Sequence, residues 1–206
     1  MRPVLAVAVA LVVVPACAPS DDGEVGTVAA PIIGGTLAGD DGAVVLLASY
    51  PTDRSVLATC TATLIAPDVL LTAAHCVDTQ NHPGWIFGMF PGADASAYPT
   101  LAALEPHLLP VSATHAHPAY DRSPPFNADI AVALLAAPYT AVAPLPIRRD
   151  PLTAAMVGQP ARIVGYGQAV VGTPSSTRRQ AVTVIDGIDV GDTVRVGDAQ
   201  HLTCLG

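Results

Sequence analysis

Two titratable residues, His75 and Asp129, carry the strongest indication of chemistry in this sequence. Asp129 opens the apolar run 130–135, so its carboxylate would be buried beside a strand. A buried carboxylate is costly unless a cationic or hydrogen-bonding group, such as an imidazole, meets it. Taken alone, His75 is most simply a structural histidine, so the surrounding pattern must decide between the two interpretations.

Other residues that could bind a metal or act as nucleophiles give weaker signals. His115 and His117 could form half of a metal site, but two ligands without an obvious third are weak support. We therefore predict no metal site and no cofactor. Four serines sit in no sequence context typical of a nucleophile: Ser112, Ser123, Ser175 and Ser176.

The elements that would position these residues are short strands. Segments rich in β-forming residues are separated by Gly, Pro, Asp and Asn, and no long stretch has a convincing helical period. A Pro-Asp turn at 67–68 joins two of the segments as a hairpin. The expected strands cover residues 43–49, 59–65, 69–76, 85–90, 111–115, 130–135, 162–165, 181–185 and 193–196. Short strands at this spacing predict an all-β barrel or sandwich.

Composition and charge exclude several classes of protein. The chain has 206 residues, with nine Lys and Arg against 17 Asp and Glu, and a formal net charge of -8. Because phosphate binding needs a basic face, we expect no nucleic-acid partner, and an anionic membrane surface is an equally poor partner. An apolar fraction of 51% rules out a wholly disordered chain.

The amino terminus is typical of an export signal. A basic start at Arg2 is followed by an apolar run over 4–14, which is too short to span a bilayer. We assign 1–17 to a signal peptide. Its end at Cys17 looks like a bacterial lipoprotein signal, although plain cleavage near Ala16 or Ala18 stays open. Residues 18–31 are small, polar and acidic, and we interpret them as a linker or propeptide. The expected location is therefore extracellular or in the cell envelope.

Four cysteines occur, and an oxidising compartment favours their pairing. If Cys17 is processed, three remain. Cys60 and Cys76 lie sixteen positions apart, and a disulfide closing such a loop would stabilise the fold by about 3 kcal/mol. Cys204 is then left without a partner.

Five segments, in this order, resemble the landmarks of the trypsin/chymotrypsin-like serine proteases. They are Ile32-Ile33-Gly34-Gly35, Leu71-Thr72-Ala73-Ala74-His75-Cys76, His117-Pro118-Ala119-Tyr120, Asn127-Ala128-Asp129 with the run 130–135, and Gly165-Tyr166-Gly167. The resemblance covers residue 32 to the end of the chain. It implies two six-stranded antiparallel β-barrels packed at a cleft, the first over 32–135 and the second over 136–206.

The resemblance also implies a role for each catalytic residue. A serine hydroxyl is a weak nucleophile until an imidazole removes its proton, and a buried carboxylate orients that imidazole. His75 matches the general base and Asp129 the orienting carboxylate, with a Cys60–Cys76 disulfide tethering the turn that bears His75. The family matures by cleavage before a residue that matches Ile32, here preceded by Pro31, so the activating protease is unidentified.

The last residues match the segment that leads to the nucleophile in this family. Leu202 falls on the floor of the substrate pocket and indicates an apolar or small side chain before the scissile bond. Gly206 falls on an oxyanion-hole glycine. The family's Asp-Ser-Gly-Gly-Pro would begin directly after Gly206, and the partner of Cys204 would lie further on. We therefore expect the sequence to be truncated, with its second barrel incomplete and its 206-residue form inactive.

The sequence predicts an exported serine endopeptidase whose complete form cleaves proteins or peptides. Its membrane contact would be limited to a lipid on Cys17. Two alternatives remain open: a catalytically inactive protease homologue that acts as an exported binding module, and a lipid-anchored structural protein of the envelope. A serine in the motif after codon 206 indicates the enzyme, and a stop codon or another residue there indicates the inactive homologue.

Overall fold

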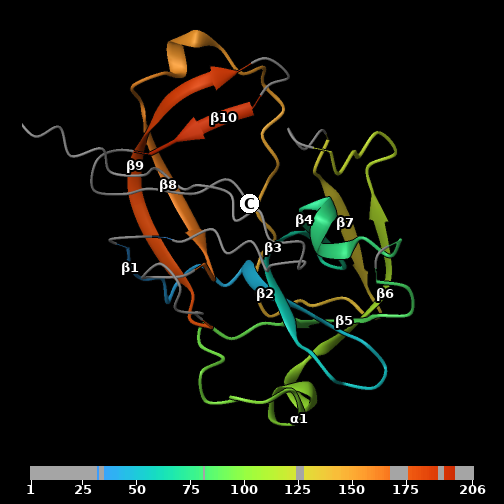
Figure 1. Ribbon diagram of the computed structural model, residues 1–206. Helices are drawn as coiled ribbons and strands as arrows, with labels where there is room; N and C mark the ends of the chain where they lie inside the picture. Colours follow the sequence, from blue (N-terminus) through green and yellow to red (C-terminus); the bar gives the residue numbers. More distant parts are fainter. Residues whose placement is uncertain are drawn as a thin grey trace, which may run out of the picture.

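The computed structural model describes residue 32 and residues 35–80, 82–123, 128–167, 176–189 and 193–197. Their regular secondary structure is almost entirely β-strand, in two antiparallel sheets that lie side by side (Figure 1). The all-β prediction is confirmed, and the first sheet closes into a six-stranded barrel.

The first barrel is built from one continuous stretch of chain. Its strands follow the order β2-β3-β4-β7-β6-β5 around the barrel, and every neighbouring pair is antiparallel. Their bounds are β2 Val44–Tyr50, β3 Ala58–Ala66, β4 Val69–Thr72, β5 Ile86–Phe90, β6 Leu109–Ala116 and β7 Ala131–Leu135. The hairpin predicted at 67–68 is confirmed, because β3 and β4 pair on either side of it.

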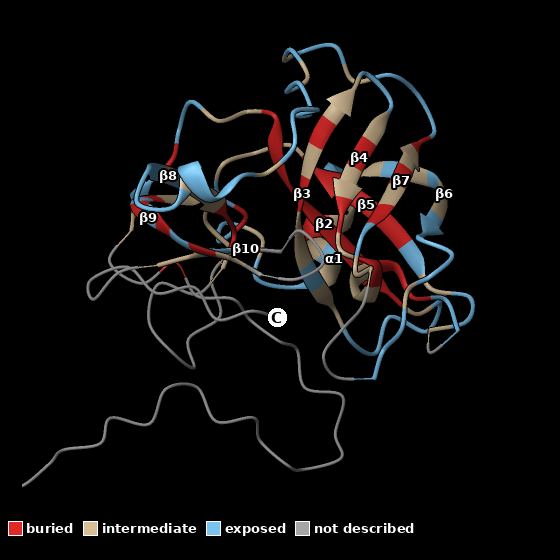
Figure 2. Cartoon of the chain, turned by 90° about the horizontal axis from the view of Figure 1, so that it is seen from above, coloured by how far each residue is buried: buried red, intermediate tan, exposed pale blue. Residues whose placement is uncertain are grey.

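Side chains of the barrel strands fill its core. All seven residues of β2 are buried, and Figure 2 shows buried positions gathered along the barrel strands. Leu64, Leu70 and Met89 are fully buried in one apolar cluster with residues of β7 and of the short 3₁₀ turn η1, Ala74–Val77. Burying a side chain of this size contributes roughly 1.5–3 kcal/mol, so the barrel is the rigid part on which a site can be built.

The second sheet consists of β1 Thr36–Leu37, β8 Pro160–Gly165, β9 Arg179–Asp189 and β10 Thr193–Val196. The long strand β9 pairs with all three of the others. Thr36 and Leu37 lie within 32–135, the range predicted for the first barrel. Their strand partners are nevertheless Gln180 and Arg179 of the second sheet. Among the described residues this sheet is open.

Helical structure is limited to single turns in the described residues. They are η1 Ala74–Val77, α1 Leu101–Leu104, η2 Glu105–His107 and η3 Ala154–Met156. The side chain of Thr100 caps α1 by accepting a hydrogen bond from the backbone N–H of Ala103. No described helix is long and apolar enough to cross a membrane.

Close contacts join the two sheets. The backbone N–H of Tyr166, just after β8, donates to Oγ1 of Thr61 on β3 at 2.9 Å. A Cβ atom on Gly165 would lie 2.8 Å from that same oxygen, which is too close for any side chain. The Tyr166 hydroxyl donates to the carbonyl of Gly92. The segment Gly165-Tyr166-Gly167 therefore positions the second sheet against the first barrel.

A buried arginine makes a further contact between the sheets. Arg178 precedes β9 and is only 2% exposed. Its Nε donates to the carbonyl of Ala38 at 2.7 Å, Nη1 to that of Val44 at 2.8 Å, and Nη2 to that of Gly39 at 2.8 Å. One guanidinium thus holds the backbone that runs from β1 into β2, and its fork of donors suits three separate acceptors.

Candidate active site

The turn that carries His75 is fixed at both ends. It begins directly after β4 and forms η1, in which Ala74 and Val77 are buried in the barrel core. Cys76 is bonded to Cys60 on β3, with Cα atoms 6.2 Å apart, so the predicted disulfide is confirmed. The disulfide closes a loop between β3 and the turn. It therefore restricts the turn in the folded protein and lowers the conformational entropy of the unfolded chain.

Asp129 lies at the matching end of the neighbouring strand. β4 and β7 are antiparallel, and Thr72 at the end of β4 pairs with Ala131 at the start of β7. Residues just after Thr72 and just before Ala131 therefore meet at one edge of the barrel, although they are far apart in sequence. The pairing register therefore places the two predicted residues at the same edge of the barrel.

The two side chains are in direct contact. Nδ1 of His75 lies 2.7 Å from Oδ2 of Asp129, and the backbone N–H of His75 donates to Oδ1 at 2.9 Å. The carboxylate therefore holds both the ring and the backbone of His75. The side chain of Asp129 is 17% exposed and that of His75 33%, so the acid is the more enclosed partner.

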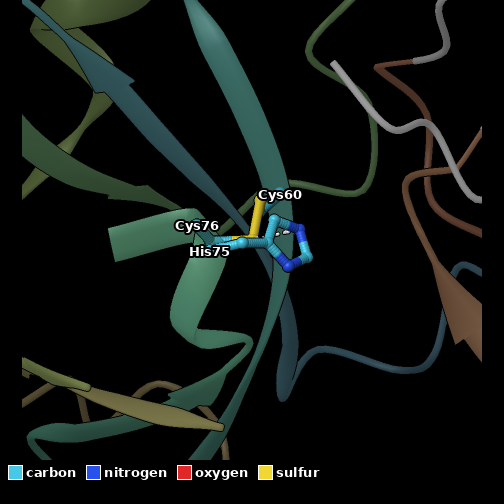
Figure 3. Close-up of side chains that lie close together, drawn as sticks. All are labelled: Cys60, His75 and Cys76. Carbon is cyan, nitrogen blue, oxygen red and sulfur yellow. Dashed lines mark hydrogen bonds between the residues drawn. A yellow bond between two sulfur atoms is a disulfide. The ribbon is translucent and has the colours of Figure 1, made fainter. Parts of the chain in front are cut away.

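This arrangement assigns the ring nitrogens their roles. A carboxylate at Nδ1 favours the tautomer that carries its proton there, which leaves Nε2 as an acceptor. Nε2 lies 3.4 Å from Sγ of Cys76, beside the disulfide (Figure 3). A partly exposed imidazole nitrogen, with its opposite side fixed by a carboxylate, can accept a proton from a hydroxyl group.

The backbone before Asp129 adopts an uncommon conformation. Ala128 has a φ of 51°, in the left-handed region that non-glycine residues rarely occupy. Its carbonyl accepts a hydrogen bond from the N–H of Ile130 at 2.7 Å, which closes a tight turn around Asp129. This turn directs the carboxylate toward η1 while the next residues enter β7.

A second ion pair ties the two halves of the site together. Oδ2 of Asp78, one residue after η1, lies 2.9 Å from Nε of Arg122, although it accepts no well-aligned hydrogen bond among the described residues. The Asp78 side chain is 7% exposed. Oδ1 of Asp78 accepts the backbone N–H of Gln80 at 3.0 Å. The pair thus joins the His75 turn to the loop that follows β6.

Tyr120 lies in the field of both carboxylates. Burial raises the pKa of its phenol, and the negative charges of Asp129 and Asp78 raise that pKa further, against the opposing effect of Arg122. The phenol therefore stays protonated at neutral pH. Tyr120, the last residue of the predicted motif His117-Pro118-Ala119-Tyr120, also packs against the barrel core.

The described residues also test the weaker candidates. His117 uses Nδ1 to accept the N–H of Ala119 at 3.2 Å, and neither it nor His115 belongs to a group of three metal ligands in the described part of the chain. Ser112 donates its hydroxyl to the carbonyl of Leu134 at 3.1 Å, away from His75. The one group of three potential metal ligands found in these residues is Cys60, His75 and Cys76, whose two sulfur atoms are bonded to each other.

The other predicted site residues are not part of the contact between His75 and Asp129. Ile32 is 6% exposed, and its carbonyl accepts the N–H of Gly35 at 3.2 Å. Cys17, Leu202, Cys204 and Gly206 lie outside the described residues.

Sequence reasoning missed Asp78, Arg122 and Arg178. Their charges were visible, but nothing in the sequence separates a buried or paired charge from a solvated one. The position of Asp78, three residues after His75, was the one available signal.

Comparisons with known proteins identify the family and the fold of the chain. The family model described as Trypsin matches residues 47–205. A solved protein named GrC is 18% identical, with a TM-score of 0.61, and 82% of this chain aligns with 76% of that one. Neuropsin, a serine protease expressed in the limbic system of mouse brain, is 20% identical, with a TM-score of 0.58, and 82% of this chain aligns with 75% of it. No curated protein sequence matched. Because the family model spans most of the chain, this protein belongs to the trypsin family.

Proposed function

We propose that the complete protein is a serine endopeptidase in which His75 is the general base and Asp129 orients it. The observation that carries this proposal is the double contact of the Asp129 carboxylate with Nδ1 and the backbone N–H of His75, at 2.7 Å and 2.9 Å. It leaves Nε2 as the acceptor for the hydroxyl proton of a serine. Family membership supports proteins or peptides as the substrates.

The mechanism then follows from the chain's own groups. Nε2 takes the serine proton as the hydroxyl attacks the peptide carbonyl, and later returns it to the leaving amine. Asp129 stabilises the imidazolium formed between these steps. Among the described residues no serine is hydrogen-bonded to His75. The expectation that the nucleophile is the serine of an Asp-Ser-Gly-Gly-Pro motif rests on the family resemblance.

The test begins with the coding sequence after codon 206. If it encodes Asp-Ser-Gly-Gly-Pro in frame, the complete product is assayed for peptide hydrolysis and for labelling by a fluorophosphonate, which reacts with activated serines. Asp129→Asn should lower kcat by roughly 10⁴-fold because the amide favours the wrong ring tautomer. The matched control is Asp121→Asn in the neighbouring loop, an exposed carboxylate that accepts the backbone N–H of Ser123 and should leave kcat unchanged.

Two results would refute the enzyme proposal. One is full activity in the Asp129→Asn and His75→Ala variants. The other is a stop codon, or a residue other than serine, in the expected motif, which would make the protein an exported binding module. Loss of the nucleophile alone costs about 10⁶ in kcat, so replacing the serine of that motif by alanine in the complete product should abolish hydrolysis that depends on His75.

We also propose export through residues 1–17, with Cys17 as a candidate for lipidation and Ile32 as the mature amino terminus. The support is the basic start, the apolar run 4–14 and the resemblance of residues 32–35 to the family's activation site. Mass spectrometry of the mature protein checks this. A lipid on Cys17 or a terminus at Ile32 is expected, and an unprocessed Met1 would refute it.

A further inference from the structure

The turn that carries His75 ends in a buried carboxylate. Asp78 is the first residue after η1, three positions beyond His75, and its side chain is only 7% exposed. Its carbonyl accepts the backbone N–H of His82 at 3.2 Å, and its Oδ1 accepts that of Gln80 at 3.0 Å. These bonds hold Asp78 at the end of the turn and leave Oδ2 for another partner.

Arg122 supplies that partner from a different loop. Its Nε lies 2.9 Å from Oδ2 of Asp78, and no other cation in the described part of the chain pairs with this oxygen. A buried carboxylate needs such a partner, because burial removes the water that would otherwise solvate its charge. The position of Asp78, and with it the end of η1, therefore depends on Arg122.

The loop that bears Arg122 is also tied to the chain beside Asp129. The backbone N–H of His117, at the start of this loop, donates at 2.9 Å to the carbonyl of Ile130, the residue after Asp129. The N–H of Tyr120 donates at 2.9 Å to the carbonyl of His117 and closes the turn that precedes Arg122. The loop thus has one attachment beside the acid of the candidate pair and another at the end of the turn that bears the base.

We propose that Arg122 is a positioning residue for the His75–Asp129 pair. By holding Asp78, it fixes the end of η1 so that His75 presents both Nδ1 and its backbone N–H to the carboxylate of Asp129, at 2.7 Å and 2.9 Å. The disulfide and the buried apolar residues of η1 fix the middle of the turn, whereas Arg122 fixes its end. The effect on catalysis rests on the proposed function, but the positioning itself does not.

Loss of the cation should displace the base. Without Arg122, the carboxylate of Asp78 must reach water or take up a proton, and either change alters the end of a turn that is only four residues long. Because a misplacement of about 1 Å costs about 10²-fold in rate, Arg122→Ala in the complete protein should lower kcat by about 10–100-fold. KM should stay unchanged, because Arg122 acts through His75 and not on the substrate.

Proton NMR of the complete protein with isotope-labelled histidine measures the positioning directly. A proton held between Nδ1 and a carboxylate resonates far downfield of other imidazole protons, and Asp129→Asn should remove this signal. Arg122→Ala should shift or broaden it. Arg122→Lys should restore both the signal and kcat at least in part, because the contact with Asp78 uses a single nitrogen atom. The NMR measurement needs neither a nucleophile nor a substrate.

Arg54→Ala is the matched control. It breaks an ion pair of similar length, 2.8 Å from Nη2 of Arg54 to Oε1 of Glu105, which joins the loop after β2 to η2. This variant should change neither the NMR signal nor kcat. Equal effects of Arg54→Ala and Arg122→Ala would overturn the proposal, because the loss would then be a general consequence of breaking an ion pair.

The remaining outcomes separate this proposal from the proposed function. An unchanged signal in Arg122→Ala overturns the positioning, and so does a raised KM at an unchanged kcat, which would place Arg122 on the substrate. If Arg122→Ala does not fold by circular dichroism, the double variant Asp78→Asn/Arg122→Ala, which buries no unpaired charge, must show the same shift of the signal. If the signal responds to Arg122→Ala but the unmodified protein hydrolyses no peptide, the positioning holds and the proposed function fails.

Discussion

Replacing Arg178 by alanine should destabilise the protein by roughly 3–5 kcal/mol, because three backbone carbonyls lose their charged donor. The side chain is 2% exposed and donates to three carbonyls, those of Ala38, Gly39 and Val44. A hydrogen bond from a charged donor contributes roughly 1.5–3 kcal/mol, and each buried carbonyl left without a donor costs about 1–3 kcal/mol. The variant also no longer has to bury a positive charge, and this gain offsets part of the loss.

Urea unfolding followed by tryptophan fluorescence and circular dichroism measures the change. With an m value near 2 kcal/mol/M, the midpoint should fall by about 2 M. Arg178→Lys keeps the charge, but one ammonium group cannot reach three separated carbonyls, so it should recover only part of the loss.

Arg162 provides a matched control. Its guanidinium also makes three hydrogen bonds, to both carboxylate oxygens of Asp41 and to the side chain of Gln180, but its side chain is 48% exposed. Arg162→Ala should therefore cost less than about 1 kcal/mol. Equal losses for Arg162→Ala and Arg178→Ala, or a loss below 1 kcal/mol for Arg178→Ala, would refute the argument that burial decides the outcome.

Three further predictions follow from charges and backbone conformation. Ala128→Gly should raise the free energy of unfolding by up to about 1 kcal/mol in urea melts, because glycine occupies a φ of 51° without steric cost. A loss of stability would contradict the argument that the backbone at Ala128 is strained. Arg122→Ala should destabilise the protein by about 1–3 kcal/mol, because it leaves the carboxylate of Asp78 without its cation. A double-mutant cycle with Asp78→Asn should show coupling between the two residues, and additive losses would contradict this ion pair's contribution. The hydrogen bonds and charge of Arg162 hold the pKa of Asp41 below its ordinary value of 3.8, so their stabilisation should be complete above that pH and lost as the pH falls through the lowered pKa. Melts of wild type and Arg162→Ala between pH 2 and 7 should converge in acid, and a constant difference would contradict the linkage.

The strands of the barrel could be predicted closely because their ends carry local signals. Strand β2 was expected at 43–49 and runs over Val44–Tyr50, between Gly42 and Pro51, which both interrupt extended structure. The hairpin of β3 and β4 is fixed by its Pro-Asp turn. By contrast, β1 has only two residues and gains its conformation from β9, so no local pattern could reveal it. The four residues of α1 are likewise too few for a helical period.

In the candidate site, too, some residues could be predicted from the sequence and others could not. His75 and Asp129 could be identified because their motifs are distinctive, and the register of β4 against β7 brings them together. The pairing of Asp78 with Arg122 depends on the path of the loop after β6, which the sequence does not encode locally. Arginine side chains are ordinarily exposed, so the residue type gave no reason to predict that Arg178 is buried.

The pairing of β1 with β9 has a consequence for the order of events during synthesis. The first barrel can form as soon as its continuous stretch has left the ribosome. Thr36 and Leu37 must wait for Gln180 and Arg179, and the hydrogen bond from Arg179 to the carbonyl of Gly35 spans 144 positions. At translation rates of about 5–20 residues per second, the leading segment remains without its strand partner for on the order of ten seconds. A protease or chaperone at the exit site would meet it in that interval as an unpaired, extended peptide.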